Sequence, residues 1–133
     1  MQQVEMVQAQ PRPRRRQSKP RILIVEDEAM IAMMLEDMLQ DMGCEIAGSF
    51  GDLGTALRWV AGHEGDFDAA LLDVNLGGET VFPVADVLYK KGKPFGFVTS
   101  YASIPQARGY DAQVLNKPVS QRDLESLVES FTH

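Results

Sequence analysis

The 133-residue sequence predicts a single α/β domain: a doubly wound, five-stranded parallel sheet between two layers of helices. Three observations lead to this prediction. Five short apolar runs alternate with segments whose apolar residues recur at helical spacing. Strands that alternate with helices in this way are parallel and joined by right-handed crossovers. Four of the five runs also end in polar residues, which suits a parallel sheet that carries a site at the carboxyl ends of its strands.

The first half of the chain supplies three predicted strands and two helices. Residues 21–25 are apolar and β-branched after the leading arginine, which is typical of a central strand buried on both faces. Asp52 is an expected helix N-cap. Four of the seven methionines fall in the first helix, and we expect methionines to fill the core. The predicted elements are a strand at 21–25, a helix that ends at Gly43, a strand at 44–50, a helix from Asp52 to about 61, a loop at 62–66 and a strand at 67–73.

The second half continues the alternation but contains one irregular stretch. Gly77-Gly78 predicts a turn. Residues 104–109 are too short and too broken for more than a turn or two of helix, so the fourth helix is expected to be short or absent. The predicted elements are a helix from Glu79 to about Lys91 with Pro83 in its first turn, a strand at 94–100, a strand at 112–115 and a helix from Ser120 to the C-terminus.

Charge is distributed unevenly along the chain. Residues 1–20 carry +4 and are rich in Gln, Pro and Arg, which predicts a disordered basic tail before a folded domain at 21–133. That domain carries −10, which argues against nucleic acid as its partner. The tail leaves nucleic acid, a membrane, an acidic protein or no partner open.

The single cysteine, Cys44, excludes an intramolecular disulfide and a Cys-based zinc site. One free thiol is compatible with a reducing compartment, and we expect a cytoplasmic protein. The sequence shows neither an apolar run long enough for a transmembrane helix nor a hydrophobic signal core, so no membrane partner is expected.

The polar residues at the strand ends form a candidate site. Glu26 and Asp27 follow the first strand, Asp73 ends the third, Thr99 ends the fourth and Lys117 follows the fifth. Carboxyl ends of parallel strands meet at one edge, so these groups can converge. Three carboxylates repel one another unless a cation neutralises them, and oxygen ligands with room for water suit Mg²⁺. The site is therefore a candidate Mg²⁺ centre.

Asp73 is the candidate acceptor of a phosphoryl group at this centre. The backbone carbonyl of Asn75 is a further candidate Mg²⁺ ligand, Lys117 would balance the remaining charge, and Thr99 could donate a hydrogen bond to a phosphoryl oxygen. An acid at a strand end is by itself more often a helix cap or a solvated group, and only the joint pattern favours chemistry. Glu28 is expected to be an acid in the first turn of the first helix, where the helix dipole favours it, and not a metal ligand.

The motifs resemble the receiver domain of two-component response regulators over residues 21–131. The resemblance rests, in family order and nearly family spacing, on Ile-Leu-Ile-Val-Glu26-Asp27-Glu, Leu-Leu-Asp73-Val-Asn75-Leu, Phe-Val-Thr99-Ser100 and Lys117-Pro118. It implies a flavodoxin-like sheet of strand order 2-1-3-4-5, a phosphoacceptor at Asp73, and Mg²⁺ bound by Asp27 directly and by Glu26 directly or through water. It also implies switch and phosphate-binding roles for Thr99 and Lys117, and a cis Lys117-Pro118 bond.

Within the family, residues 94–101 are similar to single-domain receivers with a Phe-Ala-Thr-Gly-Tyr-like signature. Three departures are notable. Glu26 stands where an Asp is more usual, Val114 stands where most receivers carry a switch Tyr or Phe, and Lys117 follows Thr99 by only 18 positions. Tyr101 and Ser100 are therefore the substitute candidates for the switch.

The expected function is that of a stand-alone response regulator, not an enzyme. It would take a phosphoryl group from a histidine kinase or a histidine phosphotransfer protein and signal by binding an unknown downstream protein. The alternatives are a phosphorelay shuttle or phosphate sink that passes the group to a histidine phosphotransfer protein, and a binding module that works without phosphorylation. An aspartyl-phosphate hydrolase would need an acid two residues after the nucleophile, where Asn75 stands.

Overall fold

The computed structural model describes residues 19–101 and 103–131, so the predicted basic tail lies outside the described residues except for Lys19 and Pro20. The main sheet consists of β1 (Arg21–Val25), β2 (Glu45–Phe50), β3 (Ala69–Asp73), β6 (Phe95–Thr99) and β7 (Gln113–Asn116). A hairpin is formed by β4 (Asn75–Leu76) and β5 (Glu79–Thr80). The helical elements are α1 (Ala29–Asp41), α2 (Leu53–Gly62), α3 (Phe82–Lys90) and α4 (Gln121–Phe131), with the 3-10 turns η3 (Glu64–Asp66) and η4 (Pro105–Tyr110).

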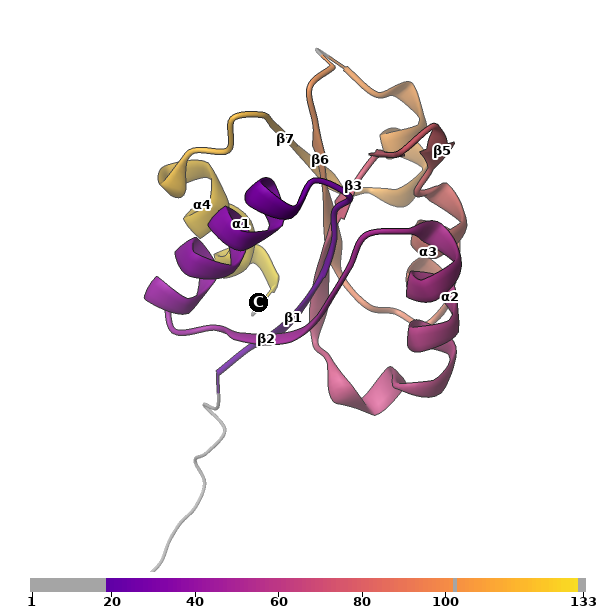
Figure 1. Cartoon of the computed structure of the whole chain (residues 1–133), viewed down its shortest axis with the longest axis horizontal. Coiled ribbons are helices and arrows are strands. Elements are labelled where there is room, and N and C mark those ends of the chain that lie inside the picture. Colours follow the sequence, from indigo (N-terminus) through magenta and orange to yellow (C-terminus); the bar gives the residue numbers. More distant parts are fainter. Residues whose placement is uncertain (1–18, 102, 132–133) are drawn as a thin grey trace, which may run out of the picture.

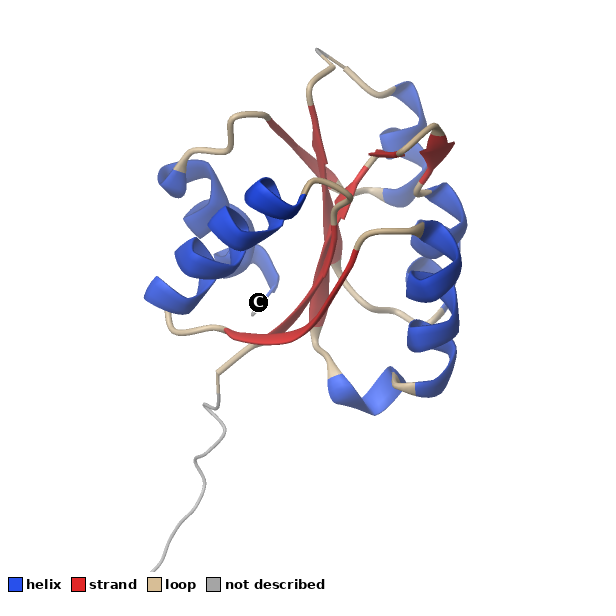
Figure 2. Ribbon diagram, in the orientation of Figure 1, coloured by secondary structure: helices blue, strands red, loops and turns tan. Residues whose placement is uncertain are grey.

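The five main strands pair in the order β2-β1-β3-β6-β7, and all four pairings are parallel. The helices α1 and α4 cover one face of the sheet, and α2 and α3 cover the other (Figures 1 and 2). The predicted three-layer, doubly wound, flavodoxin-like sheet of order 2-1-3-4-5 is thus confirmed. In that numbering, which leaves out the hairpin strands β4 and β5, β6 and β7 are the fourth and fifth strands. None of the helices in the described ranges has the length and apolar character needed to cross a membrane.

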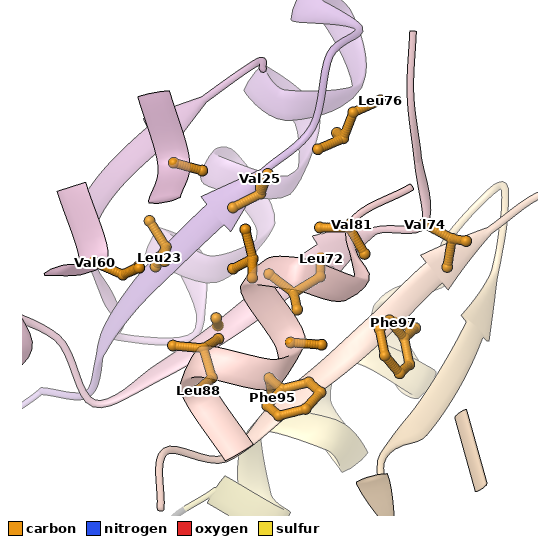
Figure 3. Close-up of a cluster of buried hydrophobic side chains, with 14 of the residues drawn as sticks. Leu23, Val25, Val60, Leu72, Val74, Leu76, Val81, Leu88, Phe95 and Phe97 are labelled. Carbon is orange, nitrogen blue, oxygen red and sulfur yellow. The ribbon is translucent and has the colours of Figure 1, made fainter. Parts of the chain in front are cut away.

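Each face of the sheet has its own apolar core, because successive strand residues point to opposite faces. Leu23, Val25 and Leu72 pack under α2 and α3 (Figure 3), whereas Ile22 and Leu71 pack under α1 and α4. The central strands β1 and β3 are buried on both faces, as the apolar runs predict. The residues that follow these two strands therefore lie at the same edge of the sheet.

The predicted signals for helix ends are confirmed. The Asp52 carboxylate accepts the Thr55 N–H at 3.0 Å and caps α2. Gly43 follows α1 with a φ of +87°, a conformation that costs glycine least. Pro83 lies in the first turn of α3, where its missing N–H breaks no helical hydrogen bond.

The prediction that the third helix begins at Glu79 is wrong, because α3 begins at Phe82. Glu79 and Thr80 instead pair antiparallel with Leu76 and Asn75. The predicted Gly77-Gly78 turn joins the two short strands, and both glycines have positive φ, at +63° and +97°. This hairpin sits directly after Asp73 and places Asn75 at the edge of the candidate site.

The fourth helix of the alternation is reduced to the 3-10 turn η4, as predicted. Tyr110, at the end of η4, packs where this short connection leaves room. Its ring stacks on Phe82 with a centroid distance of 6.2 Å and meets Phe95 and Phe97 edge-on at 5.8 Å. Its hydroxyl donates to Asp86 Oδ1 at 2.5 Å, and burial together with this carboxylate raises the pKa of Tyr110 to about 12. Four aromatic rings, from η4, α3 and β6, therefore pack together beside this short connection.

The expectation that the methionines fill the core is wrong for three of them. Met30, Met33 and Met34 are 83%, 63% and 40% exposed. The reason is that α1 lies against one face of the sheet along a narrow line, and only Ala32, Leu35 and Leu39 of this helix are buried. The outward side of α1 is therefore unusually apolar near its N-terminus.

Candidate functional site

The carboxyl ends of β1, β3, β6 and β7 bring the predicted site residues to one edge of the sheet. Glu26 and Asp27 follow β1 directly, and Asp73 is the last residue of β3. Thr99 is the last residue of β6 and pairs in register with Asn116 of β7. Lys117 follows β7, and its backbone N–H donates to the Thr99 carbonyl at 2.8 Å. Ordinary strand pairing is therefore what aligns these groups.

Three carboxylates lie together at this edge. One oxygen each from Glu26, Asp27 and Asp73 lies within 4.8 Å of the others. Glu26 and Asp73 are buried and Asp27 is exposed, so the cluster opens to solvent on the side of Asp27. Buried carboxylates this close repel each other strongly.

Lys117 is the cation that opposes this repulsion. Its ammonium lies 3.1 Å from Glu26 Oε1, 3.4 Å from Asp73 Oδ2 and 3.7 Å from Glu28 Oε1. Although burial alone lowers a lysine pKa, the hydrogen bond to Glu26 and the charges of Asp73 and Glu26 raise the pKa of Lys117 overall. Lys117 therefore stays protonated at neutral pH.

One positive charge does not balance the cluster. Burial, followed by the charge of Glu26, raises the pKa of Asp73 from 3.8 to about 7, against the opposing effect of Lys117. Glu26 Oε1 is buried and, within the described part of the chain, accepts no hydrogen bond, although the Lys117 ammonium lies nearby. A buried acceptor without a hydrogen bond is costly, and among the described residues only the ion pair with Lys117 offsets that cost. Both observations indicate room for a second cation.

The chemistry of these donors fits Mg²⁺. Carboxylate oxygens are the hard ligands that this ion takes, and the open side toward Asp27 leaves space for its waters. Asn75 lines the same cavity, and its N–H lies 3.4 Å from Asp73 Oδ1. Whether its carbonyl completes the set of ligands stays a prediction.

A cavity of about 280 Å³ connects all of the predicted site residues except the buried Glu26. Thr99 is 2% exposed on its floor, and Tyr101 is 57% exposed at its rim beside Ser100. The Thr99 hydroxyl accepts the Tyr101 N–H at 3.0 Å. The lining residues are Asp27, Glu28, Asp73, Asn75, Gly77, Thr99, Ser100, Tyr101 and Lys117.

Two contacts of this site were not predicted from the sequence. Glu28 is the N-cap residue of α1, outside the first turn, and its side chain faces Lys117 instead of capping the helix. Asn116 donates from Nδ2 to the Tyr101 carbonyl at 2.6 Å. Its position next to Lys117 at a strand end was the available signal, since residues there face the site edge.

Val114 stands where most receivers carry a switch aromatic residue. Val114 is half-buried, pairs in register with Phe97 and packs against the apolar core that also contains Phe95 and Phe97. The peptide bond between Lys117 and Pro118 is cis, as predicted.

Comparison with known proteins agrees with this geometry. The family model described as "Response regulator receiver domain" matches residues 22–129. The transcriptional regulatory protein PdtaR of Mycobacterium tuberculosis is 32% identical over 114 residues, which cover 82% of this chain. The chain spans only 55% of the length of this curated relative.

Two solved structures illustrate the similarity in fold. SdrG from Sphingomonas melonis Fr1 is 39% identical, with a TM-score of 0.74 over 86% of this chain and 98% of SdrG. The receiver domain of PhyR from Erythrobacter litoralis is 26% identical, with a TM-score of 0.75 over 88% of this chain and 92% of that domain. By its sequence match and by its fold, the chain belongs to the response regulator receiver domain family.

Proposed function

We propose that this receiver domain accepts a phosphoryl group on Asp73 from a phosphohistidine of a kinase or phosphotransfer protein. The observation that carries the proposal is the cluster of Glu26, Asp27 and Asp73 with the Lys117 ammonium 3.4 Å from the proposed nucleophile. Receiver domains bind Mg²⁺ at acidic residues, and this cluster has the donors for it.

In the proposed reaction an Asp73 oxygen attacks phosphorus and forms the O–P bond. The N–P bond to the histidine breaks, and its electron pair stays on the imidazole nitrogen. Mg²⁺, when bound by the three carboxylates, supplies positive charge for the transferring oxygens. Lys117 supplies a second, fixed positive charge, and Thr99 can rotate to donate its hydroxyl to a phosphoryl oxygen.

The proposed output is a change in the surface formed by the end of β6, the segment at 100–101 and β7. Thr99 and Lys117 shift the equilibrium between two arrangements of this surface when the acyl phosphate forms. A structure of SdrG in a BeF3-activated conformation, 38% identical with a TM-score of 0.71, supports testing the same treatment here. The proposal includes a cytoplasmic location, which suits the free, buried thiol of Cys44.

The test is transfer of label from a phosphorylated histidine kinase in the presence of Mg²⁺. We expect label on the wild-type protein and none on Asp73→Asn. Asp66→Asn is the matched control, because Asp66 is an exposed acid before β3, at the opposite end of that strand. Labelling that survives Asp73→Asn would refute the assignment of the acceptor.

A further inference from the structure

The backbone of Tyr101 is held from both sides. Its N–H donates to Thr99 Oγ1 at 3.0 Å, and its carbonyl accepts Asn116 Nδ2 at 2.6 Å. Its ring, by contrast, is exposed at the rim of the cavity. The described contacts therefore fix the peptide of this residue and leave its side chain in solvent.

The two anchors come from elements that the sheet already aligns. Thr99 and Asn116 are partners across the β6–β7 pairing, and the Thr99 carbonyl accepts the Lys117 N–H. Asn116 reaches the Tyr101 carbonyl from outside the acidic cavity, since it does not line that space. It can thus hold the 100–101 segment without touching the reacting groups.

The Thr99 hydroxyl links this segment to the proposed chemistry. A hydroxyl has one donor and two acceptor sites, and here one acceptor site receives the Tyr101 N–H. If Thr99 rotates toward a phosphoryl oxygen on Asp73, the Tyr101 N–H loses its acceptor. The hydrogen bond from Asn116 to the Tyr101 carbonyl then becomes the interaction that resists movement of the segment.

We propose that Asn116 is a positioning residue, a latch that stabilises the unphosphorylated arrangement of residues 100–101. It thereby sets how readily Thr99 rotates toward a phosphoryl group on Asp73. This inference rests on the proposed function, because Thr99 must leave Tyr101 when Asp73 is phosphorylated. Removal of the latch favours the rearranged state, and a ligand selective for that state then binds more tightly. Asn116→Ala should therefore increase the affinity for such a ligand, whereas loss of a purely structural residue would not increase it.

The first measurement uses the free protein. We expect the Tyr101 amide of Asn116→Ala to exchange with solvent about three- to ten-fold faster than wild type by NMR, the factor that one hydrogen bond provides. Gln113→Ala is the matched control, because it removes an exposed amide from the same strand outside the 100–101 segment. An unchanged exchange rate in Asn116→Ala would overturn the latch whether or not Asp73 is a phosphoacceptor.

The second measurement couples the latch to the site. Titration with BeF3⁻ in the presence of Mg²⁺ should reach half-saturation at an about three- to ten-fold lower concentration in Asn116→Ala than in wild type or Gln113→Ala. Equal or weaker binding by Asn116→Ala would overturn the regulatory role. Failure of the wild-type protein to bind BeF3⁻ at all would contradict the proposed function instead, and the regulatory role would fall with it.

Discussion

Replacement of Asp73 by asparagine should stabilise the Mg²⁺-free protein at alkaline pH. Asp73 is buried beside Glu26, and these two influences raise its pKa from 3.8 to about 7. The native protein therefore holds a proton on Asp73 that the unfolded chain releases near pH 4. Between about pH 4 and pH 7 the free energy of unfolding falls as pH rises, and the loss is complete above the native pKa.

The size of the effect follows from the two pKa values. Each unit of difference corresponds to about 1.36 kcal/mol, so the ionised Asp73 side chain costs up to about 4 kcal/mol at pH 8. Asparagine has the same shape without the titration. Asp73→Asn should therefore match the wild-type protein near pH 4 and exceed its stability by about 2 to 4 kcal/mol at pH 8.

Urea unfolding followed by Trp59 fluorescence, at several pH values in EDTA, measures this difference. Mg²⁺ should reduce the difference in unfolding free energy between Asp73→Asn and the wild-type protein. At a Mg²⁺ concentration of ten times the dissociation constant, binding stabilises the wild-type protein by about 1.4 kcal/mol. If Asp73→Asn is less stable than wild type at pH 8, or if its advantage does not change with pH, then the burial of the Asp73 carboxylate beside Glu26 does not govern the pH dependence of stability.

Three further substitutions test the packing and the charge balance by urea unfolding. Lys117→Met removes the cation among the buried carboxylates and should lower the free energy of unfolding by about 3 to 5 kcal/mol without Mg²⁺. A loss below about 1 kcal/mol would contradict that role. Tyr110→Ala should lower the free energy of unfolding by about 3 to 5 kcal/mol, because it removes the packed ring. Tyr110→Phe loses only the hydrogen bond to Asp86 and should lower it by about 1 kcal/mol. Equal losses would show that the ring packing is unimportant. Gly96→Ala places a Cβ 2.6 Å from Leu127 Cδ2 and should cost about 1 to 3 kcal/mol, whereas a neutral result would mean that α4 shifts freely.

The fold and the acid cluster could be predicted because both depend on local patterns. Apolar runs such as Ile22–Val25 identify buried strands, and parallel pairing brings every strand end to the same edge. Glu26, Asp27 and Asp73 therefore had to meet once the sheet formed. Their shared proximity to Lys117 followed from the same rule.

The features that escaped prediction depend on contacts between distant segments. Two-residue strands such as β4 and β5 are too short to show a period, so the Gly77-Gly78 hairpin was predicted only as a turn before a longer helix. Helical spacing cannot show how few residues of α1 the sheet covers, so it placed Met34 on the same buried face as Leu35, although Met34 is 40% exposed. The bond from Asn116 to Tyr101 depends on a loop conformation that no spacing encodes.

The central claim is that Asp73 is a Mg²⁺-dependent phosphoacceptor, and its most direct test is mass spectrometry after incubation with phosphoramidate. This small donor carries the same P–N bond as phosphohistidine and needs no cognate kinase. We predict one added phosphoryl group in Mg²⁺, none in EDTA, and a modified peptide that contains Asp73. A phosphoryl group on any other residue, or equal labelling in EDTA, would contradict the account.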